Sequence, residues 1–329
     1  MGKEQLWLIM LSLGIMIFVL IVVFVIYAYV LVKFRERKGQ TGYPKQVEGN
    51  HKLEIIWTVV PFILLLILAV PTIASTFSLD KNYANDPNAL QVKVTGHQFW
   101  WEFEYMNEKI TTAQDLYIPT GRVISFHLES ADVIHSFWVP ALGGKKDTNP
   151  GMTNMHFLKA DEPGVYYGKC AELCGASHAL MDFKVIAVTP EEFDRWVASM
   201  KSPTTTAAVG SEGEQIFKKS CIGCHAVYDG GQKAVTGGKV GPNLEAYGMR
   251  TTVAGILANS KSGELADTNV DPAILKKNLK TWLSDPQAVK PGNRMPNPKK
   301  VEGSRMEQDL GLNDAQIDAL VEYLSSMKR

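Results

Sequence analysis

The sequence predicts a multidomain membrane protein: a two-helix transmembrane hairpin, then an all-β domain, then an all-α domain. Three observations predict this order. Two long uncharged runs lie near the N-terminus, polar and apolar residues alternate between Leu90 and Val188, and apolar residues recur at helical spacing after Ser211. The 329 residues leave room for about two folded domains, and a net charge of zero gives no reason to expect a nucleic-acid partner.

The hairpin is predicted over residues 1–80. No charged residue occurs from Leu6 to Val32 or from Ile55 to Phe77, and each run is long enough for the roughly 20 residues that cross a bilayer. A cleaved signal peptide is the alternative for the first run, but its apolar core would be only about 7–15 residues long. Few residues precede the first span, so the start of the chain is compatible with removal of a preceding segment.

The distribution of basic residues predicts the topology of the hairpin. Only Lys3 precedes the first span, whereas the loop between the spans carries Lys33, Arg35, Arg37, Lys38, Lys45 and Lys52. Because basic loops stay in the cytoplasm, we expect both termini, and everything after Phe77, on the extracytoplasmic side.

An all-β domain is predicted over residues 88–198. Short alternating segments are separated by turn residues such as Pro119-Thr-Gly121 and Pro163-Gly164, a pattern typical of a β-sandwich or barrel. The predicted strands are Leu90–Thr95, Gln98–Tyr105, Arg122–Glu129, Asn154–Lys159, Val165–Gly168 and Asp182–Val188. A short helix, Pro190–Met200, follows them.

The C-terminal domain is predicted over residues 211–329, after a polar linker of small residues at 199–210. Its predicted helices are Glu212–Lys219, Leu275–Leu283 and Asn313–Met327. The last of these has apolar residues at helical spacing and Asn313 as its N-cap.

The stretch Gly168–Met181 carries four metal-ligand side chains within a short loop: Cys170, Cys174, His178 and Met181. Thiolate and thioether are soft ligands and imidazole is borderline, a combination that favours copper or another transition metal over Mg²⁺ or Ca²⁺. A second imidazole from elsewhere would complete the shell. A structural zinc site is the alternative, although zinc rarely recruits Met.

Cys221-Ile-Gly-Cys224-His225 is the attachment pattern of a c-type haem. Two thiols on one turn can form thioethers with the haem vinyl groups, and the adjacent imidazole can reach the iron. A Cys-x-x-Cys-His zinc site would need a fourth ligand, and none is evident. Since the chain has four cysteines, two in each motif, none remains for a structural disulfide.

A methionine is expected as the second axial ligand of the iron. Met295 is the preferred candidate because Pro291-Gly-Asn-Arg-Met-Pro296 cannot be helical and presents the thioether on a loop. The other candidates are Met249, Met306 and Met327. We expect Gly241-Pro-Asn-Leu244 to pass over the haem edge on the imidazole side.

The order of hairpin, β domain with a Cys-x3-Cys-x3-His-x2-Met loop, linker and haem domain resembles subunit II of haem-copper cytochrome c oxidases with a fused C-terminal cytochrome c. The resemblance covers essentially the whole chain. It implies a cupredoxin-like Greek-key domain that holds the binuclear copper centre CuA, and a class I cytochrome c domain. The implied copper ligands are His135, Cys170, the backbone carbonyl of Glu172, Cys174, His178 and Met181, with both thiolates bridging the two coppers.

The same resemblance implies roles for several further residues. The Glu172 carboxylate would reach a magnesium ion shared with subunit I, near Lys145 and Asp147. The aromatic stretch Phe99, Trp100 and Trp101 matches the family's electron path, although Phe99 replaces a Trp and core packing is the alternative role. Glu54 aligns with a glutamate at the mouth of a proton path, or is simply a favourable acid at a helix start.

Resemblance to this family implies a terminal oxidase subunit in the bacterial cell membrane. Electrons would pass from haem c to CuA and on to subunit I, which carries haem a and CuB and reduces O2 to water with proton translocation. Subunit III would be a further partner, and a bc-type complex or a small cytochrome c would be the donor. The tether between the domains would raise their effective concentration into the millimolar range.

Two alternatives remain open from the sequence. A nitric-oxide or nitrous-oxide reductase component also uses CuA and would differ in the catalytic subunit that purifies with it. A membrane-anchored electron carrier without a catalytic partner would be active as a single chain. A quinol-oxidase subunit II is disfavoured, because that branch lacks the copper ligands present here.

Overall fold

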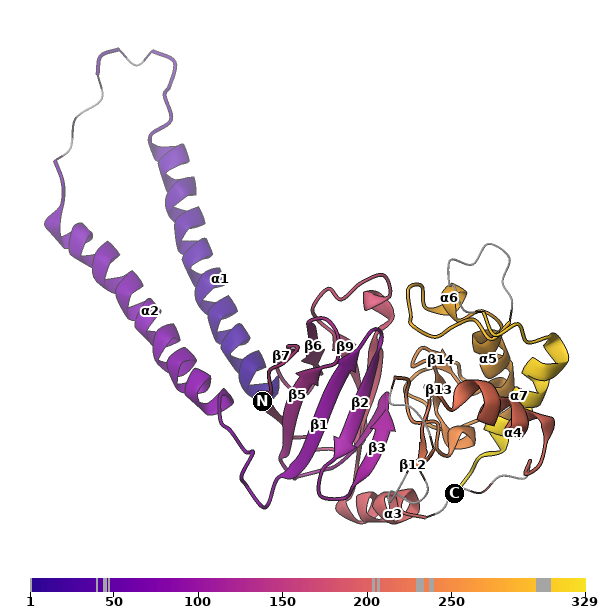
Figure 1. Cartoon of the computed structure of the whole chain (residues 1–329). Coiled ribbons are helices and arrows are strands. Elements are labelled where there is room, and N and C mark those ends of the chain that lie inside the picture. Colours follow the sequence, from indigo (N-terminus) through magenta and orange to yellow (C-terminus); the bar gives the residue numbers. More distant parts are fainter. Residues whose placement is uncertain are drawn as a thin grey trace. The chain divides into compact units, whose positions relative to one another are not determined.

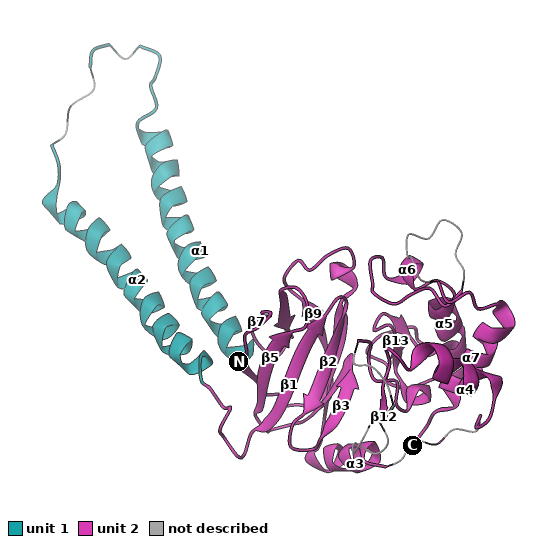
Figure 2. Cartoon of the chain, viewed as in Figure 1, with its two compact units in different colours: residues 1–81 teal, residues 82–329 magenta. Residues whose placement is uncertain are grey.

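The computed structural model describes residues 2–39, 41–43, 46, 48–202, 205, 208–228, 234–236, 240–299 and 309–329. The chain forms two compact units, residues 1–81 and 82–329, which are teal and magenta in Figure 2. The first unit is helical. The second unit contains both the β-sheets and the C-terminal helices, so the two predicted extramembrane domains pack together (Figure 1).

The first unit consists of α1 (Gly2–Lys33) and α2 (His51–Leu79), which contain the predicted spans. Both helices are long and apolar enough to cross a membrane. Their large apolar side chains are mostly exposed, and an apolar surface of this extent requires lipid or partner helices to cover it. α2 begins after Asn50, whose side chain accepts hydrogen bonds from the backbone N–H groups of Lys52 and Leu53.

Two five-stranded sheets form the β domain, in the orders β3-β2-β1-β5-β8 and β4-β10-β9-β6-β7 (Figure 1). β1 runs parallel to β5, and β4 runs parallel to β10, whereas the other neighbours in these sheets are antiparallel. The strands are β1 (Leu90–His97), β2 (Trp100–Tyr105), β3 (Ile110–Ala113), β4 (Asp115–Pro119), β5 (Ile124–Ser130), β6 (His135–Trp138), β7 (Lys145–Thr148), β8 (Asn154–Leu158), β9 (Gly164–Cys170) and β10 (Asp182–Val188).

All six predicted strands are present, with ends that shift by about two residues or less. β3, β4, β6 and β7 were not predicted, because each is too short to show a convincing alternation. The helix α3 (Pro190–Met200) has its predicted bounds. Thr189 caps it in a capping box with Glu192.

Aromatic rings fill the space between the two sheets and fix the strands that carry the predicted metal ligands. Phe137 of β6 stacks on Phe183 of β10 with ring centroids 4.8 Å apart, and Trp101 packs against Phe183 at 5.5 Å. All three rings are buried. Gly168 of β9 allows this packing, because a Cβ there would lie 2.2 Å from the Phe183 ring.

The C-terminal domain is built mainly of helices, as predicted. They are α4 (Glu212–Ile216), which continues as the π-helical turn η2 (Phe217–Cys221), then α5 (Pro272–Ser284), α6 (Pro286–Val289) and α7 (Asp314–Ser326). Asn313 is the N-cap of α7, as predicted. Two short ladders were not predicted: β11 (Val227–Tyr228) with β12 (Ala234–Thr236), and β13 (Thr252–Val253) with β14 (Leu257–Ala258).

The described part of the predicted linker is held against the C-terminus. Thr205 exchanges backbone hydrogen bonds with Lys328, of 2.7 and 2.9 Å. The Arg329 guanidinium donates to the carbonyl oxygens of Ser199, at 2.9 Å, and Ser202, at 2.7 Å. These contacts restrict the first part of the linker, from Ser199 to Thr205.

We predict that Gly213→Ala destabilises the C-terminal domain. Gly213 lies on α4 where this helix crosses α7, and a Cβ there would lie 2.1 Å from the carbonyl oxygen of Ala319. Because the backbone of α7 cannot move aside as a flexible side chain can, the substitution should lower the free energy of unfolding by about 1–3 kcal/mol. Differential scanning calorimetry should show a lower unfolding temperature for Gly213→Ala and little change for Gln215→Ala, which is exposed on the same helix. Equal unfolding temperatures would contradict this packing.

Candidate metal and haem sites

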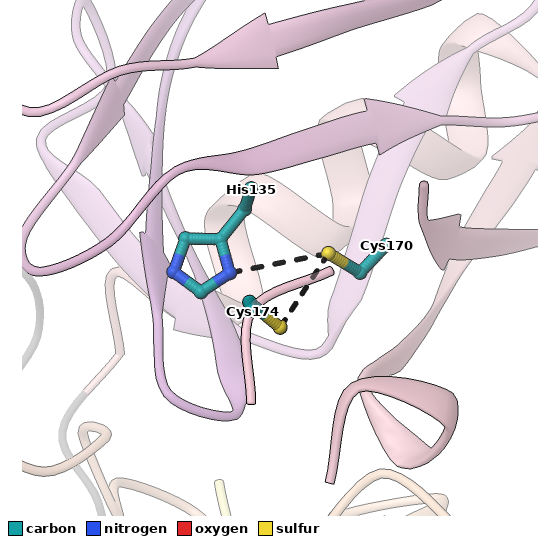
Figure 3. A group of neighbouring side chains, drawn as sticks. All are labelled: His135, Cys170 and Cys174. Atoms are coloured by element: carbon teal, nitrogen blue, oxygen red, sulfur yellow. Dashed lines mark hydrogen bonds between the residues drawn. The ribbon is translucent and has the colours of Figure 1, made fainter. Parts of the chain in front are cut away.

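The predicted copper-ligand side chains converge at one end of the second sheet. His135 is the first residue of β6 and Cys170 is the last residue of β9, and these two strands are neighbours in the sheet. The loop from β9 to β10 carries Cys174, His178 and Met181. Figure 3 shows His135, Cys170 and Cys174 directed toward one another.

The distances within the cluster form a chain of sulfur and nitrogen donors. Nδ1 of His135 lies 3.9 Å from Sγ of Cys170, which lies 3.8 Å from Sγ of Cys174. The Cys174 sulfur in turn lies 3.5 Å from Nδ1 of His178 and 3.7 Å from Sδ of Met181. The structure thus brings together every predicted ligand side chain.

This donor set has the chemistry that copper requires. The ligand atoms of His135, Cys170 and Cys174 all lie within 4.8 Å of one another, and the three residues are buried. The carbonyl oxygen of Glu172 lies 3.3 Å from the Cys170 sulfur, on the same side of the loop. Soft sulfur and borderline nitrogen ligands fit copper, and the thioether of Met181 is a donor that zinc rarely uses.

The sulfur atoms of Cys170 and Cys174 are close enough for each to affect the ionisation of the other. The hydrogen bond between them lowers the pKa of Cys170 and raises the pKa of Cys174, because only one sulfur can carry the negative charge without a cation nearby. A bound metal removes this restriction, since a coordinating thiol is deprotonated outright.

Asp132 orients His135 from behind the predicted metal site. An Asp132 carboxylate oxygen lies 2.8 Å from Nε2 of His135, which leaves Nδ1 directed at the cluster. Burial alone would raise the pKa of Asp132, but its hydrogen bonds from His135 and from the backbone N–H groups of Gln98 and Val133 lower it to about 2. The same hydrogen bond raises the pKa of His135 against the opposing effect of burial.

The predicted haem residues line a single cavity in the C-terminal domain. Cys221 and Cys224 lie at the end of the π-helical turn and just after it, and His225 follows them. The cavity is closed on one side by residues of the β domain. Its lining includes Cys221, Cys224, His225 and Met295 together with Gln98, Phe99 and Trp100.

His225 is oriented so that one ring nitrogen remains for a metal. Its Nδ1 lies 2.9 Å from the carbonyl oxygen of Pro242, so Nδ1 donates and Nε2 is left as the basic nitrogen. Burial lowers the pKa of His225, which favours the neutral imidazole that iron requires. Gly241 passes against this ring, because a Cβ there would lie 2.6 Å from Cε1 of His225. The predicted course of this loop on the imidazole side is consistent with that contact.

Met295 lies on the cavity wall, partly buried against the C-terminal core. Asn293 shapes its loop: the Asn293 side chain accepts from the backbone N–H of Met295 at 2.8 Å and donates to the Lys290 carbonyl at 2.7 Å. Met249 is exposed and Met327 is buried in the core, and neither lines the cavity. Met306 lies outside the described residues. Among the described candidates, Met295 is therefore the one placed to ligate a haem iron.

The three aromatic residues of the predicted electron path have different surroundings. Phe99 and Trp100 line the haem cavity, and Trp100 stacks on His97 at 4.1 Å. Trp101 is a core residue that lies 5.9 Å from the His135 ring, measured between centroids. The aromatic stretch thus extends from the cavity to the side of the copper cluster.

The remaining predicted side chains belong neither to the cluster of ligand side chains nor to the lining of the cavity. Glu54 is in the first turn of α2, 3.2 Å from the His51 ring, where an acid is favourable in any case. The Glu172 side chain is exposed. Lys145 and Asp147 lie on β7, which pairs with β6.

Family models match three parts of the chain. Cytochrome C oxidase subunit II, transmembrane domain, matches residues 2–74, and the periplasmic domain of the same subunit matches residues 107–188. Cytochrome c matches residues 210–328. The matches imply a CuA copper site and a haem in chains of this type.

Two relatives are similar to this chain over most of their own length. Cytochrome c oxidase subunit 2 of Alkalihalophilus pseudofirmus is 48% identical and aligns with 99% of this chain and 89% of its own. The protein of that name from Bacillus sp. (strain PS3) is also 48% identical, over 90% of this chain and 80% of its own. The periplasmic domain of subunit II of cytochrome oxidase from Bradyrhizobium japonicum is 34% identical, covers 34% of this chain and 93% of its own, and superposes with a TM-score of 0.33.

We predict that Gly241→Ala displaces the His225 ring. The added Cβ would overlap Cε1 of the imidazole, which must then tilt away from the Pro242 carbonyl. Haem should still attach through the two cysteines, but the visible absorption spectrum should show altered axial ligation. Gly223→Ala is the matched control, because a Cβ at Gly223 meets nothing within 4 Å. Identical spectra for the two variants would contradict this geometry.

Proposed function

Because this chain belongs to the family of cytochrome c oxidase subunit II, we propose that it receives electrons at its C-terminal domain and delivers them from its β domain to subunit I. The observation that carries the proposal is the shared cavity. Its wall combines the Cys221-Ile-Gly-Cys224-His225 motif with Gln98, Phe99 and Trp100 of the β domain, which lie beside the copper-ligand loops.

We infer that the β domain holds two copper ions. His135, Cys170, Cys174, His178 and Met181 would provide the ligand side chains and Glu172 a carbonyl oxygen. Two buried sulfurs 3.8 Å apart support ligation by both thiolates at one site. When bound, copper and haem iron supply one-electron chemistry. The residues of this chain keep water away and hold the donors in place, so that little rearrangement accompanies a change of charge.

The C-terminal domain would attach one haem through thioether bonds to Cys221 and Cys224. His225, with its Nδ1–H donated to Pro242, would provide a nitrogen ligand to the haem iron, and Met295 would provide a thioether ligand. Met295 rather than a second imidazole would favour a higher reduction potential.

We propose that the reduction of O2 to water and the translocation of protons occur in subunit I, with subunit III as a further partner. A magnesium ion at the subunit I interface would be reached by the exposed Glu172 carboxylate. The donor to the C-terminal domain would be a bc-type complex or a small cytochrome c. Glu54 would lie at the mouth of a proton path.

The chain would sit in the bacterial cell membrane with two spans, and both extramembrane domains would face the extracytoplasmic side. The basic loop between α1 and α2 supports this orientation, because positive residues stay in the cytoplasm. Copper loading and covalent haem attachment would both take place on that outer side.

We expect the purified chain to contain two copper ions and one covalent haem, and no zinc. His178→Asn should reduce the copper content and alter the copper EPR signal, because the imidazole lies beside the Cys174 sulfur. His127→Asn is the matched control: His127 also lies in the β domain but bonds to Gln91, away from the cluster. Elemental analysis that finds zinc in place of copper, or equal losses in both variants, would refute the copper assignment.

We further expect Cys174→Ser, in the assembled oxidase, to leave reduction of the haem intact while it blocks electron transfer through the copper site. The haem should remain reducible by ascorbate with a mediator, because the C-terminal domain is unchanged. Oxygen consumption should be lost, because the proposed copper site lacks one of its two sulfur ligands. Stopped-flow reduction of the haem and an oxygen electrode measure the two outcomes, and continued oxygen consumption without copper would rule out this route.

A further inference from the structure

The loop that carries Met295, residues 290–296, is also the part of the C-terminal domain that meets the copper-ligand loops. We name it the Met295 loop. Three of its residues make polar contacts with the β domain: Lys290, Pro291 and Arg294. The corresponding β-domain residues are Phe99, Ser177, Gln98 and Asp132.

We propose that the Met295 loop docks the C-terminal domain on the copper-ligand loops in one fixed position, with Lys290 as its buried anchor and Arg294 as its link to Asp132. Both are positioning residues. The docking rests on the contacts alone. Its consequence for electron transfer rests on the proposed function.

Lys290 makes a buried contact with the β domain through its ammonium group. Its Nζ donates to the Phe99 carbonyl oxygen at 2.8 Å, and the residue is only 3% exposed. Burial lowers the pKa of Lys290 to about 8, against the attraction of the Asp182 carboxylate. Burial of an ammonium group is costly unless partners replace its water, so this contact indicates a closed interface from which solvent is excluded.

The backbone of the Met295 loop fits closely against the loop that carries His178. Ser177, the residue before that histidine, donates its hydroxyl to the Pro291 carbonyl at 2.7 Å. Gly292 has φ +77°, and a Cβ there would lie 3.2 Å from the Cβ of Ala176. A positive φ and this close approach both favour glycine at the contact.

Arg294 connects the Met295 loop to the cluster of copper-ligand side chains. Its Nη2 lies 3.7 Å from Oδ2 of Asp132, and the other oxygen of that carboxylate contacts Nε2 of His135. The Arg294 side chain is 60% exposed, so the pair adds little to stability. Its effect is therefore on the placement of Asp132, and through it on the imidazole of His135.

Gln98 makes a second bridge between the same two loops. Its Nε2 donates to the Cys174 carbonyl at 2.6 Å, and its Oε1 accepts from Arg294 at 3.4 Å. One side chain of the β domain thus contacts both the copper-ligand loop and the arginine beside Met295. A shift of the C-terminal domain would disturb both contacts.

A separate group of polar contacts joins the domains away from the metal cluster. Lys184 of β10 donates to the Thr251 hydroxyl at 2.6 Å and to the Leu265 carbonyl at 2.9 Å. Thr251 in turn donates to Asp115 at 2.6 Å. Arg250 adds a hydrogen bond of 2.8 Å to the Ala113 carbonyl. The Met295 loop is the first anchor between the domains, and this group of contacts is the second. Two separated anchors fix the orientation of the domains, whereas one alone would let them rotate about it.

The decisive experiment compares Lys290→Met with Lys276→Met in the full chain. Methionine keeps the length of the lysine stem but removes its ammonium group. Lys276 is the control, because it pairs with Glu322 inside the C-terminal domain and does not reach the β domain. Hydrogen–deuterium exchange of residues 170–181 and 290–296 reports docking without any dependence on turnover, and electron transfer after photoreduction of the haem reports its consequence.

Lys290→Met should increase exchange in both segments and slow transfer between the domains by about tenfold or more, because loss of the ammonium group leaves the buried Phe99 carbonyl oxygen without its donor. Thr251→Val should loosen the second anchor without changing the copper EPR signal. Arg294→Gln should alter that signal with little change in exchange. Lys276→Met should change none of these. Should Lys290→Met fail to fold, Thr251→Val carries the exchange comparison against Lys276→Met, and Arg294→Gln carries the comparison of the copper EPR signal.

Equal exchange and equal transfer rates in Lys290→Met and Lys276→Met would overturn the docking proposal. A wild-type chain without copper would instead overturn the proposed function, and the exchange result would still decide the docking. The two failures are therefore distinguishable.

Discussion

The position of two buried cysteine sulfurs, 3.8 Å apart, is the constraint on which the ligand end of the β domain depends. The loop that carries Cys170 and Cys174 could adopt many conformations if it were free. Hydrogen bonds to neighbouring backbone restrain it: the N–H of Cys170 donates to the Met181 carbonyl, and the N–H of Ala171 donates to the Ser136 carbonyl. Both ends of the ligand loop and the start of β6 are thereby fixed to one another. Gly168 allows Phe183 to pack directly beneath.

Features that depend on neighbouring residues could be predicted from the sequence. The bounds of α3, the N-cap at Asn313 and the grouping of four ligands after Gly168 all follow from local patterns. The cysteine pair before His225 is equally local. In each case the physical cause operates over a few residues, through hydrogen bonds within one turn or through the spacing of ligands along one loop.

Features that depend on distant residues could not be predicted in this way. His135 came from a family resemblance and not from spacing, because β6 has only four residues and shows no clear alternation. The hydrogen bond from Lys290 to Phe99 joins positions separated by 191 residues. Nothing in the sequence around Lys290 distinguishes it from a solvated surface lysine. Asp132 gave a weak signal, since it lies three residues before a histidine that it can contact.

The contacts between the domains change the role assigned to the linker. A flexible tether would only raise the effective concentration of one domain near the other. Here the described part of the linker is itself bonded to the C-terminus through Thr205 and Lys328, and the domains share buried polar contacts. Because the chain makes docking intramolecular, the interface need not supply the translational and rotational entropy that two separate proteins would lose. A few well-placed contacts, such as Lys290 on Phe99 and Ser177 on Pro291, can then define the geometry where a large apolar surface would otherwise be required.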